Sequence, residues 1–111
     1  MDKNSMKDTI NKIKSALNTA LLRFANAGYE HAEEELLITW YSREIQIAEK
    51  HPKYIPEHSI DSLKTYIDAH KKHQQELSEE AMDLDVLIKA LEDACDAAEA
   101  YEKKYLEDKD E

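Results

Sequence analysis

The chain has few of the residues that interrupt helices or cross-link a fold: its 111 residues include one glycine, two prolines and one cysteine. A single cysteine, Cys95, excludes an internal disulfide framework, and one glycine cannot build the glycine-rich loops that cradle phosphates. No stretch of the sequence approaches the roughly 20 apolar residues that a membrane span needs. We therefore expect a cytoplasmic protein without a membrane segment or a nucleotide-binding loop.

The residues that are abundant favour helices. Ala, Leu, Glu and Lys are frequent, and they are strong helix formers and poor strand formers. The hydrophobic fraction of 41% is sufficient for a core beside the 36% of charged residues. The sequence therefore predicts a single all-α domain over residues 1–107, followed by an acidic disordered tail at residues 108–111.

The N-terminal half predicts two helices. The first begins at Asn4 or Ser5 and ends at Gly28, because glycine readily adopts the left-handed conformation that closes a helix. The second runs over residues 30–50, and both prolines fall in a loop at residues 51–58. In the first of these helices the apolar positions step by three and four: Met6, Ile10, Ile13, Leu17, Ala20, Phe24 and Ala27.

Residues 59–107 predict one long helix, capped by Ser59, because a three-four alternation of core positions continues there without glycine or proline. Ser78 followed by two glutamates is also typical of a new helix start, so a break at Ser78 stays open. The expected fold is a helical hairpin packed on a long C-terminal helix, a three-helix bundle, or a four-helix bundle if the chain breaks near Ser78. The core positions are Ile60, Leu63, Ile67, His70, Gln74, Leu77, Ala81, Leu84, Ile88, Leu91, Cys95, Ala98, Glu102 and Tyr105.

The stretch "AHKKHQQEL", residues 69–77, places two histidines three residues apart. His70 and His73 could share a metal ion, but a metal site needs three or four ligands and the sequence does not supply the others. We expect instead that His70 and Gln74 are polar core residues that fix the register of the helices, while Lys71, Lys72 and His73 face water. No metal and no cofactor are expected.

Negative charge is concentrated toward the C-terminus. The net charge is −10, and residues 59–111 contain 16 acidic against 7 basic residues. On a helix, acidic residues three and four apart form rows, which repel nucleic acid and favour a basic protein partner. Small acidic helical DNA mimics, including phage proteins that block restriction or CRISPR effectors, are similar in size and composition. The expected acidic partner-binding face is Glu76, Glu80, Asp83, Asp85, Glu92, Asp96 and Glu99.

The C-terminal half also has more apolar residues than one core face requires, so we expect a partner or a second copy of the chain to cover it. Trp40, Tyr41 and Tyr54 are candidate anchors for a partner because aromatic residues often dominate binding energy. The candidate partner or oligomer face is Leu84, Leu87, Leu91, Ala94, Ala98 and Tyr101.

The function expected from these features is that of a non-catalytic interaction protein, which binds and inhibits a basic protein surface such as a nucleic-acid-processing complex. The alternative is a structural or assembly protein that forms a homodimeric helical bundle or coiled coil. A minor alternative is a metal-binding or pyrophosphatase-like helical enzyme. Glu30 and Glu33, with Glu80 and Asp83, resemble the carboxylate pairs with which all-α nucleotide pyrophosphatases bind magnesium, although the two pairs lie further apart here than in that family.

Overall fold

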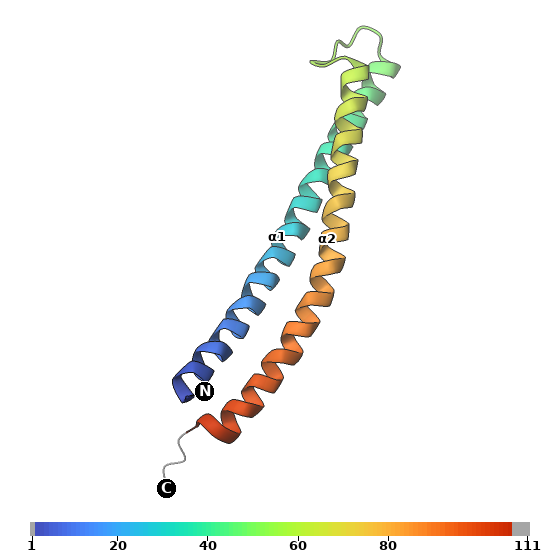
Figure 1. Ribbon diagram of the computed structural model, residues 1–111. Helices are drawn as coiled ribbons and strands as arrows, with labels where there is room; N and C mark the ends of the chain where they lie inside the picture. Colours follow the sequence, from blue (N-terminus) through green and yellow to red (C-terminus); the bar gives the residue numbers. More distant parts are fainter. Residues whose placement is uncertain (1, 108–111) are drawn as a thin grey trace. The chain divides into compact units, whose positions relative to one another are not determined.

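The computed structural model describes residues 2–107, which form two long α-helices and one short π-helix. Helix α1 is Lys3–Lys50, helix α2 is Ile60–Tyr101, and the π-helix η1 is Glu102–Leu106 (Figure 1). None of the described residues is in a strand, which confirms the all-α prediction. The expected acidic tail, residues 108–111, lies outside the described residues.

The predicted helix end at Gly28 is wrong, because α1 continues through this residue to Lys50. Gly28 does not have a positive φ, and a Cβ atom at this position would meet nothing within 4 Å. The three-four phase of the apolar residues before Gly28 continues after it, through Glu34, Ile38, Tyr41 and Ile45. The glycine is therefore an exposed residue inside a helix rather than its cap, and the expected three-helix count is not found.

The long C-terminal helix is confirmed, and Ser78 lies inside α2. Ser59 caps this helix as expected, because its Oγ accepts a hydrogen bond of 3.1 Å from the backbone N–H of Ser62. Helix α1 begins earlier than predicted. Asp2 is its cap, and its carboxylate accepts a hydrogen bond of 2.8 Å from the backbone N–H of Ser5. The proline loop between α1 and α2 lies where the sequence predicted it.

The chain divides into two compact units. The first unit contains the described residues up to Ala25 and those from Met82 onward, so it pairs the start of α1 with the end of α2. The second unit is Asn26–Ala81, which pairs the end of α1 with the start of α2 across the proline loop. In each unit the helices therefore run antiparallel.

Each unit buries small and aliphatic side chains between its two helices. In the first unit, Ile10, Ala98 and Leu106 form a buried cluster against which Met6 and Ile13 pack. Cys95 is buried in the same unit, as its core position predicted. The buried hydrophobic residues of the second unit are Ala27, Ile38, Leu63, Ile67 and Leu77.

The π-helix changes which residue of the last turn is buried. The backbone N–H of Glu107, the residue after η1, donates to the carbonyl oxygen of Glu102, five residues earlier. An α-helix makes this bond over four residues, so the turn contains one added residue. As a result Leu106 is 4% exposed, whereas Tyr105, the predicted core residue, is 54% exposed. The prediction of Tyr105 in the core is wrong for this reason. Its ring instead lies beside that of Tyr101, with the centroids 4.8 Å apart.

Candidate functional site

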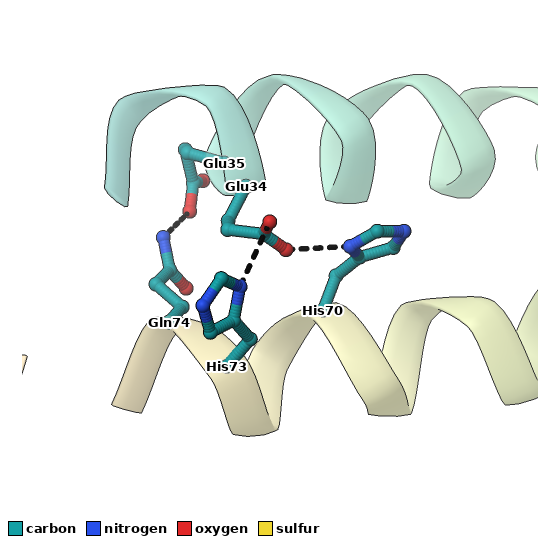
Figure 2. Close-up of polar contacts among 5 residues, drawn as sticks. All are labelled: Glu34, Glu35, His70, His73 and Gln74. Atoms are coloured by element: carbon teal, nitrogen blue, oxygen red, sulfur yellow. Dashed lines mark hydrogen bonds and ion pairs between the residues drawn. The ribbon is translucent and has the colours of Figure 1, made fainter. Parts of the chain in front are cut away.

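A polar layer crosses the second unit between α1 and α2. Figure 2 shows Glu34 and Glu35 of α1 reaching toward His70, His73 and Gln74 of α2. Nδ1 of His70 lies 2.5 Å from Oε2 of Glu34, and Nδ1 of His73 lies 3.1 Å from Oε1 of the same carboxylate. Gln74 donates through Nε2 to Oε2 of Glu35 at 2.7 Å. Three side-chain contacts among these five residues thus join the two helices.

The carboxylate of Glu34 is the centre of this layer, and only 13% of its side chain is exposed. Burial is the largest single influence and acts to raise the pKa of Glu34. It is outweighed by the hydrogen bonds from His70 and His73 together with the positive charge that either imidazole carries when protonated, all of which favour the ionised form. The pKa of Glu34 is therefore lower than its ordinary value, and the carboxylate is ionised at neutral pH.

The polar layer agrees with the expectation for His70 and Gln74, which are half-buried and contact α1. It differs from the expectation for His73, whose side chain was predicted to face water. Half of the His73 side chain is exposed, yet its ring turns back to Glu34. Both oxygens of this carboxylate are occupied by imidazoles from the facing helix, which suits a role in holding register rather than in chemistry.

The sequence also suggested carboxylate pairs that might hold a metal. Among residues 2–107, no group of three or more His, Cys, Asp or Glu side chains is placed to bind a metal ion. Glu30, Glu33 and Glu80 belong to the second unit, whereas Asp83 belongs to the first.

The candidate anchors lie near the proline loop in the second unit. Trp40 and Tyr54 line one pocket of about 710 Å³ together with Arg43, Ile47 and Ile55. The indole of Trp40 is 69% exposed, so it is available for contact. Tyr41 does not line this pocket. It is half-buried and packs against Tyr66 and His70, with ring centroids 5.7 and 5.8 Å away.

Most of the predicted acidic face is exposed. Asp85 pairs with Lys89 on the same helix at 3.1 Å, and about half of its side chain is exposed. Glu80 is half-buried and, with Glu76, belongs to the second unit. The exposed acidic residues of the predicted face in the first unit are Asp83, Asp85, Glu92, Asp96 and Glu99.

The predicted apolar face is divided by the fold. Ala98 is buried against Ile10 and Leu106 and belongs to the core of the first unit. Leu84, Leu87 and Leu91 line a groove of about 650 Å³ with residues of α1. Leu84, Leu91 and Ala94 are half-buried, whereas Leu87 and Tyr101 are exposed. The structure thus brings together three members of this face at one surface groove.

Comparisons with protein-family models, curated proteins and solved structures find no match to this chain. Within residues 2–107, neither long helix has a stretch apolar enough to cross a membrane.

The residue that the sequence reasoning missed is Glu34. The predicted helix end at Gly28 separated Glu34 from the core positions before this glycine, whereas α1 is continuous there. Two signals were present: Glu34 continues the core phase of Ile10 and Ala27, and α2 has polar residues at its own core positions, His70 and Gln74. Matching polar core residues on the two helices would have given both the site and the register.

Proposed function

We propose that this protein is a non-catalytic helical interaction protein whose acidic segment on α2 binds a basic protein surface and excludes nucleic acid from it. The proposal depends on one observation above the others, the density of exposed carboxylates at the end of α2. Four exposed acidic residues occur between positions 92 and 99 of this helix: Glu92, Asp93, Asp96 and Glu99.

The spacing of these charges along the helix supports the proposal. Residues 92–99 extend over about 10.5 Å of helix axis, since each residue of an α-helix rises about 1.5 Å. Four carboxylates over this distance give about one charge per 3.5 Å. One strand of double-stranded DNA carries about one phosphate per 3.4 Å. A basic protein groove that contacts the row of Glu92, Asp96 and Glu99 and also Asp93, which lies about 100° around the helix from Glu92, would therefore meet a similar linear charge density.

The pocket lined by Trp40 and Tyr54 supports a role in binding more generally, because exposed aromatic residues around a cavity are typical of protein contacts. We assign it no separate partner. The contribution that defines the proposed partner is electrostatic, so binding should weaken steeply as salt is added.

The test is affinity capture from a lysate of the source or host cell on the immobilised full-length chain, eluted with increasing salt. A variant with Glu92, Asp96 and Glu99 changed to Lys is compared with a control in which three other exposed acidic residues, Glu33, Glu49 and Asp68, are changed to Lys; none of these three lines the pocket of Trp40 and Tyr54. Both variants change the net charge equally. The captured protein is then purified and bound to duplex DNA with and without the chain.

The proposal expects a nucleic-acid-binding protein that the control retains, that the α2 variant loses, and that the chain displaces from DNA. Equal capture by the two variants would show that net charge, not the α2 segment, is responsible. Failure of the chain to compete with duplex DNA would reject the inhibitory mechanism.

A further inference from the structure

The second unit has a pocket of about 710 Å³ at the junction of α1 and the proline loop. Helix α1 contributes Trp40, Arg43 and Glu44 to its lining, and the loop contributes Tyr54 and Glu57. Pockets that bind ligands typically measure roughly 300–1,000 Å³. This one therefore has room for a complete side chain of another molecule.

Both aromatic rings of the pocket are available to a ligand. Tyr54 is 42% exposed and Trp40 more so, and within the described residues neither ring packs against another ring or a cation. Tyr66, in the same unit, differs because its ring already packs against those of Tyr41 and His58. The face of an aromatic ring attracts cations electrostatically. The pocket thus offers two rings to a positively charged group.

Two carboxylates line the same pocket. Glu57 is exposed and Glu44 is half-buried, and in the part of the chain that the structure describes neither makes a hydrogen bond or an ion pair. Arg43 lines the pocket too but pairs with neither of them. One guanidinium against two carboxylates leaves the lining with a net charge of −1. The pocket therefore favours a cation from outside the chain.

Arginine is the side chain whose chemistry matches both kinds of group. Its planar guanidinium stacks on aromatic rings, and its N–H groups form a fork that matches a carboxylate. The ammonium of lysine is compact and more strongly hydrated, so it lacks the planar contact. Ile47 and Ile55 also line the pocket and are exposed, which suits the alkyl stem of an arginine. Arginine is also enriched at protein interfaces.

We propose that this pocket binds an arginine side chain of a basic protein. The guanidinium stacks on the ring of Trp40 or Tyr54 and donates hydrogen bonds to Glu44 or Glu57. The kind of partner, a basic protein, rests on the function proposed above, whereas the chemistry of the pocket does not depend on the acidic segment. Arg43 opposes this ligand because like charges repel, so its removal should strengthen binding.

The test follows the indole N–H signal of Trp40 by heteronuclear NMR in the full-length chain. Trp40 is the only tryptophan, so this one signal reports on the pocket and not on the acidic segment. The probe is a short capped peptide with one arginine between glycines. Three matched peptides replace the arginine by citrulline, which has nearly the same shape without the charge, by lysine, or by glutamate.

Three variants of the chain identify the binding groups. Glu44→Gln with Glu57→Gln removes both carboxylate charges from the pocket. Its matched control is Glu33→Gln with Glu49→Gln, at two exposed residues of α1 that do not line the pocket. Arg43→Gln removes the like charge. Far-UV circular dichroism verifies that each variant is helical.

We expect the arginine peptide to shift the Trp40 signal saturably, with a dissociation constant at least about tenfold below that of the citrulline peptide. The lysine peptide should bind more weakly than the arginine peptide. The pocket double variant should weaken binding by about tenfold or more, its control should leave binding unchanged, and Arg43→Gln should strengthen it.

The absence of a saturable shift would overturn the proposal, as would equal binding of the arginine and citrulline peptides. Stronger binding of the glutamate peptide, or weaker binding of arginine by Arg43→Gln, would identify an anion site instead. The lysine variant of Glu92, Asp96 and Glu99 should keep the response of Trp40 to the arginine peptide. Capture of a partner without this response would reject the pocket alone, and the response without capture would reject the acidic segment alone.

Discussion

Replacing Gly28 by alanine tests whether α1 is continuous at this residue. A continuous helix and a helix that ends at Gly28 predict changes of opposite sign in the free energy of unfolding. Gly28 is exposed, its φ is not positive, and an added Cβ atom meets nothing within 4 Å. The substitution therefore adds neither a packing contact nor strain. What remains is the difference in helix propensity, which favours alanine over glycine by about 0.8–1.0 kcal/mol in a helix interior.

A helix that ended at Gly28 would give the opposite sign. Alanine at a left-handed cap position costs roughly 1–2 kcal/mol. The expected change in the free energy of unfolding on Gly28→Ala therefore differs by about 2–3 kcal/mol between a helix that is continuous at Gly28 and one that ends there. The assay is urea unfolding followed by far-UV circular dichroism at one fixed protein concentration. On heating, the gain should raise Tm by on the order of 4 °C.

The matched control for Gly28→Ala is Ala32→Gly, at an exposed alanine four residues further along α1. It should lower the free energy of unfolding by about as much as Gly28→Ala raises it, about 1 kcal/mol. If Gly28→Ala lowers stability while Ala32→Gly behaves as expected, the helix is not continuous at Gly28 and the reasoning is refuted.

Three further predictions concern the core, the polar layer and the π-helix. Leu63→Ala should lower the free energy of unfolding by about 2–5 kcal/mol in urea, since the side chain of Leu63 is fully buried; a loss below about 1 kcal/mol would contradict its burial. The pKa of Glu34 is lower in the folded chain than its ordinary value of 4.5. The ionised carboxylate of Glu34 therefore contributes to the free energy of unfolding above pH 4.5, and this contribution is lost as the pH falls through the lowered pKa. Acid titration of stability should therefore be flatter for Glu34→Gln than for the exposed control Glu33→Gln, and identical curves would exclude this role. Deleting Lys103 should convert the π-helix to an α-helix and leave Leu106 buried, with thermal unfolding little changed, whereas a large fall in Tm would show that the extra residue is needed.

The fold class and the long helix α2 were predictable from the sequence, because they depend on composition and on one uninterrupted pattern. The heptad phase passes through Ser78 unchanged, and the helix does too. The same phase also passes through Gly28, where the tendency of glycine to end a helix predicts a different boundary. The structure shows that phase was the better guide at both residues.

The polar layer and the last turn were less accessible to sequence reasoning. Glu34 contacts His70 and His73 only in one register of the two helices, and register depends on how both core stripes pair. The burial of Leu106 depends on an added residue in the backbone turn, for which the side chains of Glu102–Leu106 give no local signal. Both features arise from the pairing of helices and not from either helix alone.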